Sequence, residues 1–203
     1  MAYANVDLER QLWDQGISSV CGVDEVGRGC FAGPVVVGVV IFPVGFSEFH
    51  GIADSKLLSA KKRQSLVAMI KSLALCWAID EVSVDVINKV GIGKATQIAF
   101  FQVVKKLQIF PEHILIDAFY IDAFNKKMQS PVVGGDRLSV SIAAASIIAK
   151  VYRDELMENL GKEHPGYLFE VNKGYGTKAH REAIKKNGLS PLHRTSFNLS
   201  KFL

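Results

Sequence analysis

Two strand-like runs that follow each other closely near the N-terminus constrain the fold more than any other feature. Residues 20–26 (VCGVDEV) and 35–42 (VVVGVVIF) are rich in β-branched side chains, and a turn rich in glycine, with one proline, joins them. This pattern is typical of two antiparallel strands. The second run has no charged residue, so the sheet that these strands begin is expected to be covered by helices.

The rest of the chain alternates between helical and strand patterns. This alternation predicts an α/β fold whose mixed sheet is antiparallel at its start and is flanked by helices. The expected elements are a helix over 60–74 with Ser59 as its N-cap, a strand over 75–84, a helical region over 85–107 interrupted near Gly91 and Gly93, a buried strand over 113–119, a long helix over 139–160 and a last helix over 178–187 that ends at Gly188.

Composition bounds the class of protein. The 203 residues are 49% hydrophobic, which is enough for one substantial domain over residues 1–203. A net charge of +4 permits an anionic partner without requiring one. No secretion signal or membrane-spanning stretch is visible, and Cys21, Cys30 and Cys76 match no metal-site spacing. We therefore expect a cytoplasmic protein with reduced core cysteines and no membrane role.

Four acidic residues stand where strands or helices begin or end. Asp24 and Glu25 close the first strand run, Asp117 closes the buried strand and Asp136 lies in a GGD turn before the long helix. Carboxylates that converge repel one another unless a divalent cation neutralises them, and Mg²⁺ prefers such oxygen ligands. Taken singly, Asp117 and Asp136 are better explained as surface turn or cap residues, whereas apolar strands seldom end in two adjacent acids such as Asp24 and Glu25. Adjacent strand residues point to opposite faces, so Asp24 and Glu25 need a bend near Gly27 to reach one ion.

The segment GRGCFAG, residues 27–33, fits the spacing of a dinucleotide-binding fingerprint. Its context excludes that function, because a strand follows Pro34 where the fingerprint requires a helix. What remains is a bare backbone loop beside the carboxylates, which lets a ligand approach main-chain groups. A tight hairpin connection would explain the glycines but not Arg28, which is well placed to meet phosphate.

Other polar residues carry no site signal of their own. The five histidines, among them His180 and His193, lack ligand spacing and are interpreted as surface or core residues. Lys150 and Arg153 on the long helix either face phosphate or pair with Asp154 and Glu158.

Five motifs in order resemble the ribonuclease HII family over residues 20–197. They are GVDEVGRGCFAGPVVVGVVI, ADSKLLS, ILID, GGD followed by IAAASIIAKVYRDELM, and HPGYLFEVNKGYGTKAHREAIKKNGLSPLHRTSF. The resemblance implies a ribonuclease H-like fold with a C-terminal helical extension from about residue 160. It also implies an endoribonuclease that cleaves the RNA strand of RNA-DNA hybrids and incises 5′ of ribonucleotides embedded in duplex DNA, leaving a 3′-hydroxyl and a 5′-phosphate.

The resemblance also implies roles for individual residues. The family's four catalytic and metal-binding acids fall on Asp24, Glu25, Asp117 and Asp136, and two Mg²⁺ or Mn²⁺ ions are expected in the substrate complex. The nucleic-acid-binding positions fall on Gly27, Arg28 and Gly29, which sense the ribose, on Tyr175, which stacks on the next deoxyribose, and on Lys56 near the substrate backbone. The chain departs from the family pattern at Ala118, where glycine is usual, and at Arg137 and Leu138, where the family has a lysine.

The expected partners are RNA-DNA hybrid and ribonucleotide-containing duplex DNA, with no organic cofactor and a monomeric enzyme. Two alternatives remain at this point. A catalytically inactive nucleic-acid-binding module of the same fold would keep the surface but lack metal-dependent cleavage. A ribonuclease HIII-like enzyme would carry an added N-terminal domain, for which only about twenty residues precede the first strand.

Overall fold

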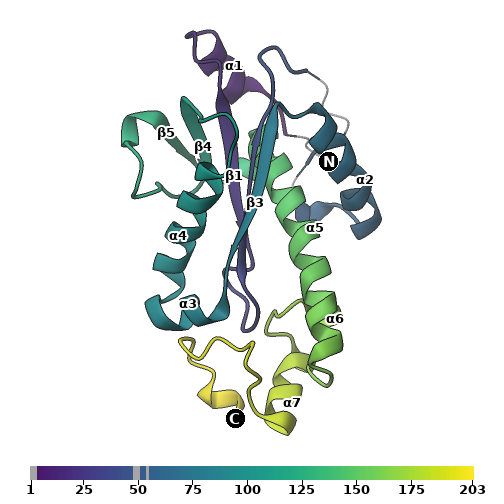
Figure 1. Cartoon of the computed structure of the whole chain (residues 1–203). Helices are drawn as coiled ribbons and strands as arrows, with labels where there is room; N and C mark the ends of the chain where they lie inside the picture. The colour runs from purple at the N-terminus through teal and green to yellow at the C-terminus, as the bar shows by residue number, and fades with distance from the viewer. Residues whose placement is uncertain (1–3, 48–50, 54) are drawn as a thin grey trace.

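A five-stranded mixed sheet forms the centre of the molecule (Figure 1). The computed structural model describes residues 4–47, 51–53 and 55–203. In the strand order β3-β2-β1-β4-β5, β1 pairs antiparallel with β2 and parallel with β4, which confirms the predicted mixed sheet. The strands are β1 Val20–Val26, β2 Val35–Ile41, β3 Cys76–Val82, β4 His113–Asp117 and β5 Gln129–Val132.

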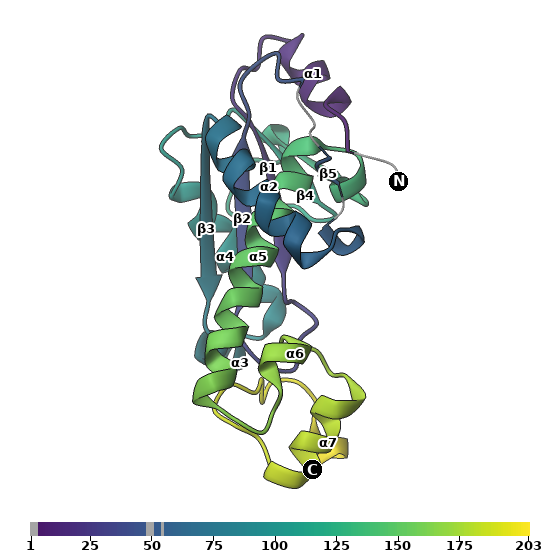
Figure 2. The ribbon, with the colours of Figure 1, turned by 90° about the vertical axis from the view of Figure 1, so that its right-hand side faces the viewer.

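Helices cover both faces of this sheet (Figures 1 and 2). The pair α3 and α4 packs on one face, while α5 and α2 pack on the other. Ser59 caps α2 by accepting a hydrogen bond from the Lys62 amide, as predicted. The helices are α1 Asp7–Trp13, α2 Ala60–Leu73, α3 Val84–Val90, α4 Ile92–Lys105, α5 Val140–Glu163, α6 Phe169–Asn172 and α7 Lys178–Asn187, with short 3-10 turns η1 Ser55–Leu57, η2 Lys126–Met128, η3 Gly135–Arg137 and η4 Ser200–Phe202.

The sequence did not predict α1, α6 or β5. Strand β5 has four residues and contains Pro131, so it lacks the signals of a regular strand and lies at the sheet edge, where proline is tolerated. Among the described residues, no helix is both long enough and apolar enough to cross a membrane.

The long helix α5 lies unusually close to β1. A Cβ atom added to Gly22 would lie only 2.1 Å from the carbonyl carbon of Ser141, so any larger residue would push the helix off the strand. Small side chains on α5, such as Ala145 and Ala149, permit the same approach. This packing fixes the start of α5, and hence the turn before it, against Gly22 of β1, two residues before Asp24.

The C-terminal part of the chain is joined to the glycine loop after β1. The amide of Phe31 donates to the Gly174 carbonyl at 2.8 Å, and the amide of Arg194 donates to the Phe31 carbonyl at 2.8 Å. Arg153 is fully buried and donates to the carbonyls of Ala32 and Pro34. Both predicted roles of Arg153 are therefore wrong: it braces backbone and neither faces phosphate nor pairs with an acid. Lys150 does pair with Asp154, at 2.7 Å.

Two buried histidines link α7 to the tail that follows it. The Nε2 atoms of His180 and His193 lie 3.1 Å apart, and both residues are buried, which agrees with the core interpretation. Burial, with the nearby His180 ring as a second cause, lowers the pKa of His193 from 6.5 to about 4. The three cysteines are also buried and form no disulfide, as expected.

The low pKa of His193 predicts a loss of stability in mild acid. Between pH 6.5 and about 4 the unfolded chain binds a proton at this residue and the native chain does not, so the free energy of unfolding should fall as pH decreases through that range. Urea unfolding at pH 7 and pH 5, with His193→Asn as the comparison, isolates the effect. Equal pH slopes for the two proteins would contradict it.

Candidate active site

Asp24 and Asp117 lie side by side at the ends of two neighbouring parallel strands. The β1–β4 register pairs Val23 with Ile116, so the next residue of each strand is one of the two acids. Both side chains share the sheet face that α5 covers, since Gly22 and Leu115, two residues before them, contact α5. The predicted convergence of these two acids is confirmed.

Asp136 joins them from the turn before α5. It lies in η3, is buried, and directly follows Gly135, whose amide donates to Asp117 Oδ1 at 2.9 Å. That hydrogen bond ties the GGD turn to the end of β4. Asp136 therefore reaches the α5 side of the sheet edge through a loop, whereas Asp24 and Asp117 are held by strands.

Glu25 approaches from the opposite face. The ladder between β1 and β2 continues regularly through Val26, so Glu25 shares the face of Cys21 and Val23, which α4 covers. The backbone changes direction only at Gly27, where φ is +91°. The bend lies at Gly27, as predicted, but it does not bring Glu25 to the face of Asp24, so Glu25 flanks the group formed by the other three acids.

The electrostatics of Asp24 reflect this gathering of negative charge. Its pKa is raised well above 3.8, chiefly by burial and next by the charge of Glu25, while Asp117 and Asp136 raise it further. A hydrogen bond from Ser146 on α5 acts in the opposite direction. Among the residues that the structure describes, no three carboxylate, histidine or cysteine side chains are grouped as a preformed metal site. Mg²⁺ binds through one or two carboxylates, keeps several waters and shares its remaining positions with substrate phosphates.

The Ser146 hydroxyl has a second partner that sequence reasoning missed. It lies 2.9 Å from the hydroxyl of Ser55, the first residue of η1, and both serines are buried. The segment ADSKLLS is thereby linked to the carboxylate of Asp24. Lys56 is the next residue of η1, but the predicted contact of its side chain falls outside the described residues and stays a prediction.

Arg28 extends from the glycine loop toward Glu25 and Phe119. Its Nη1 atom lies 4.0 Å from Glu25 Oε1, and its guanidinium carbon lies 4.7 Å from the ring centroid of Phe119. Phe119 is 46% exposed and follows the third acid by two residues. Sequence reasoning missed this residue, although an aromatic residue so close to Asp117 was the available signal.

The two glycines that flank Arg28 differ in whether the fold requires them. A Cβ atom on Gly27 would lie 2.1 Å from Nε of the buried Arg153, and its positive φ also favours glycine. A Cβ atom on Gly29 would meet nothing within 4 Å. The fold therefore requires Gly27, whereas the packing of the protein gives no reason for Gly29.

Tyr175 lies against the same loop although it is about 150 residues away in sequence. Its hydroxyl forms a hydrogen bond with the side chain of Cys30, and burial raises the pKa of this tyrosine. The ring is 40% exposed, and Nζ of Lys150 lies 5.6 Å from its centroid. The structure thus brings together the glycine loop and the tyrosine that the sequence resemblance singled out.

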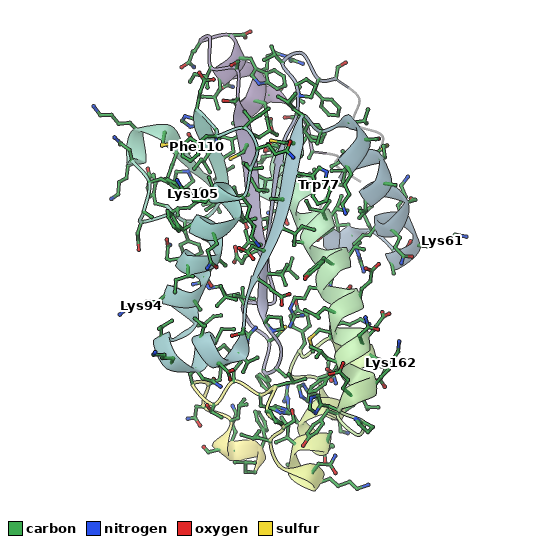
Figure 3. All side chains as sticks on the ribbon, viewed as in Figure 1. Lys61, Trp77, Lys94, Lys105, Phe110 and Lys162 are labelled. Carbon is green, nitrogen blue, oxygen red and sulfur yellow. The ribbon has the colours of Figure 1, made fainter. Side chains whose placement is uncertain are left out.

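Basic side chains far from this region point into solvent. Lys61, Lys94 and Lys162 project outward from three different helices (Figure 3). Lys61 is exposed on α2. Arg63, two residues further along α2, instead donates to the backbone carbonyls of Ser55 and Leu58, so it anchors η1.

The residue after Asp117 has a strained backbone. Ala118 has φ of +65°, a conformation that suits glycine, and this explains why the family pattern has glycine there. Ala118→Gly is expected to stabilise the protein by about 1 kcal/mol, which corresponds to a rise in Tm of about 2–4 °C for a chain of this size. Calorimetry would measure it. Ala123→Gly, in the same loop region but without positive φ, should give no gain; a gain of equal size there would contradict this explanation.

Comparison with known proteins identifies the family of this chain. The family model for ribonuclease HII matches residues 21–200. The chain is 46% identical over 190 residues to ribonuclease HII of Ligilactobacillus salivarius, covering 94% of this chain and 73% of that protein. It is 45% identical over 204 residues to ribonuclease HII of Alkaliphilus oremlandii, covering 98% of both chains.

Solved structures share the fold at lower identity. Ribonuclease H2 from Pyrococcus horikoshii superposes with a TM-score of 0.74 at 23% identity, covering 90% of this chain and 95% of that one. Bst-RNase HIII in complex with Mn²⁺ superposes with a TM-score of 0.64 at 22% identity, covering 91% and 68%. The fold is thus the expected one, and, on the near-complete match to its sequence relatives, the chain belongs to the ribonuclease HII family of metal-dependent endoribonucleases.

Proposed function

We propose that this chain cleaves RNA-DNA hybrids, and duplex DNA that contains ribonucleotides, at the sheet edge where Asp24, Glu25, Asp117 and Asp136 lie. The observation that carries the proposal is the placement of Asp24 and Asp117 on adjacent parallel strands, with the turn of Asp136 tied to Asp117. The substrate class follows from membership of the ribonuclease HII family.

The donor set fits hard divalent cations, and we assign Mg²⁺ or Mn²⁺ to it. Asp24, Asp117 and Asp136 offer carboxylate oxygens from one face, with Glu25 at the edge of the same region. The pKa of Asp24 is raised chiefly by burial and next by the charges of Glu25, Asp117 and Asp136, and a cation would relieve that repulsion. When bound, two such ions supply activation of the attacking water and stabilisation of the leaving 3′-oxygen, so that the products are a 3′-hydroxyl and a 5′-phosphate.

Selectivity for RNA requires recognition of the 2′-hydroxyl, which both donates and accepts hydrogen bonds. The main-chain groups of Gly27, Arg28 and Gly29 are suited to this task, because Gly29 has no side chain and open space beside it. Arg28, which lies between Glu25 and Phe119, is placed to meet a phosphate. Tyr175 stacks on the deoxyribose that follows the ribonucleotide, and Lys56 contacts the substrate backbone.

We further propose that residues 1–203 act as one catalytic domain, as a cytoplasmic monomer without an organic cofactor. The inactive binding module is the competing function. A cleavage assay on an RNA-DNA hybrid with and without Mg²⁺ separates the two, since only an enzyme yields metal-dependent products. Absence of cleavage at every metal concentration, with hybrid binding retained, would favour the inactive module.

Asp136→Asn is expected to raise the Mg²⁺ concentration required for half-maximal activity without changing which substrates are cut. Asp136 is held by a turn, whereas Asp24 and Asp117 are held by strands, so its loss should weaken metal affinity first. Titration of activity against Mg²⁺ measures this. If both the metal requirement and the activity were unchanged, Asp136 would be only a residue that shapes the turn before α5.

A further inference from the structure

Two adjacent residues of the C-terminal tail connect to both elements to which we assign substrate recognition, namely the glycine loop and Tyr175. His193 and Arg194 follow α7, are buried, and lie beside the glycine loop, where His193 forms a β-bridge with Ala32. Neither side chain reaches the four acids by any described contact. Their hydrogen bonds lead instead toward Tyr175 and toward Arg28.

His193 reaches Tyr175 through His180. The amide of Ser190 donates to His193 Nδ1 at 2.8 Å, so this nitrogen must be an acceptor and the proton of a neutral ring lies on Nε2. Nε2 then donates to His180 Nε2 at 3.1 Å, which leaves the proton of His180 on Nδ1. That Nδ1–H donates to the Tyr175 carbonyl at 2.9 Å. One set of tautomers therefore satisfies these three hydrogen bonds and ends on the backbone of Tyr175.

Arg194 reaches the glycine loop directly. Its Nη1 donates to the Arg28 carbonyl at 2.8 Å, and its Nε and Nη2 both donate to the Gly33 carbonyl, at 3.0 and 2.8 Å. The fork of the guanidinium thus spans the loop of residues 27–33 from its second residue to its last. A lysine carries its donors on one nitrogen and lacks the spread of the guanidinium fork, with which three separate nitrogens reach the two carbonyls.

We propose that His193 and Arg194 are positioning residues for substrate recognition: His193 sets Tyr175 through His180, and Arg194 sets the loop of Gly27, Arg28 and Gly29 through the Arg28 carbonyl. Because the two residues are consecutive, the tail fixes the distance between the glycine loop, which recognises the ribose, and Tyr175, which stacks on the next sugar. The inference rests on the proposed function, since it assumes those two roles. Displacements of about 1 Å at such positions can change rates a hundredfold.

The positioning role of His193 is tested by two substitutions whose side chains differ in length. His193→Asn can still accept from the Ser190 amide but is too short to reach His180, whereas His193→Gln keeps a group near the position of Nε2. His193→Asn should lower kcat/KM about tenfold on a duplex with one embedded ribonucleotide, and by less than about twofold on an all-RNA hybrid strand. His193→Gln should recover part of the loss, and His180→Leu should reproduce it.

A substitution of Arg194, and a double substitution of His193 and Tyr175, complete the test. Arg194→Lys should lower kcat/KM on both substrates, because both present a ribose to the loop. In a Tyr175→Ala background, His193→Asn should cause no further loss on the single-ribonucleotide duplex, since both changes act through one element. Thermal unfolding of each variant separates positioning from a general loss of folded protein.

The outcomes distinguish this inference from the function on which it rests. If Tyr175→Ala lowered kcat/KM equally on both substrates, the proposed role of Tyr175 in recognising the sugar after the ribonucleotide would be wrong. If Tyr175→Ala discriminated between substrates but folded His193→Asn and His180→Leu did not, only the positioning role of His193 would be overturned. If Arg194→Lys left kcat/KM unchanged on both substrates, the positioning role of Arg194 would be overturned.

Discussion

Replacing Asp24 with asparagine is expected to abolish cleavage at every Mg²⁺ concentration while leaving the fold intact. Asp24 is buried between Asp117, Glu25 and Ser146, so no neighbouring carboxylate can take its place without moving a strand. Loss of a ligand to catalytic cations removes several kcal/mol of transition-state stabilisation, or about a thousandfold in rate. Cleavage of an RNA-DNA hybrid across an Mg²⁺ titration measures the effect.

Stability provides an independent readout for the same variant. The pKa of Asp24 is raised, so its charge destabilises the native state near neutral pH, and the neutral amide should raise Tm. Mg²⁺ should stabilise the wild-type protein and have little effect on the variant. Asp14→Asn, at the exposed C-cap of α1, is the matched control and should change neither activity nor Tm appreciably. Near-normal turnover by Asp24→Asn would exclude Asp24 as a ligand.

Adding one methyl group at Gly29 is expected to reduce cleavage of every ribose-containing substrate about a hundredfold, because it blocks the approach of the ribose to the main chain. The substitution removes no charge, and the new Cβ atom would touch nothing in the protein. Tyr175→Ala should instead harm chiefly substrates with a DNA step immediately 3′ of the ribose. Parallel assays on an all-RNA hybrid strand and on a single-ribonucleotide duplex separate the two effects.

Gly27→Ala is the informative contrast to Gly29→Ala. Its Cβ atom would collide with Arg153, so it should lower Tm as well as activity, whereas Gly29→Ala should leave Tm unchanged. A silent Gly29→Ala would show that the open backbone has no part in recognition. Equal losses for Gly29→Ala and Tyr175→Ala on both substrates would refute the division of roles between loop and tyrosine.

Local patterns in the sequence were sufficient for strands β1 to β4 and for the pairing of Asp24 with Asp117. Strand runs that end in acids are short-range signals, and parallel neighbours bring their ends to one edge. The roles of Arg153 and the histidine pair were not predictable in this way. Arg153 is buried only because the glycine loop and the tail fold over α5, and His180 meets His193 only through that same packing.

The position of Glu25 shows a different limit. Strand alternation correctly indicated that Asp24 and Glu25 leave opposite faces, but not that the strand would stay regular through Val26. Likewise, the sequence marked Ala118 as a departure from the family pattern, while only the backbone angle of +65° explains it. Conformational detail at the end of a strand depends on tertiary contacts that local propensity does not contain.

The most direct test is cleavage mapping on a DNA duplex with one embedded ribonucleotide, in the presence and absence of Mg²⁺. The expected result is a single metal-dependent incision on the 5′ side of the ribonucleotide, with a 3′-hydroxyl and a 5′-phosphate at the nick, and no product from Asp24→Asn. Cleavage without added divalent metal, incision of the all-DNA duplex, or an unaffected Asp24→Asn variant would contradict the assignment of the four carboxylates as a ribonucleotide-specific metal site.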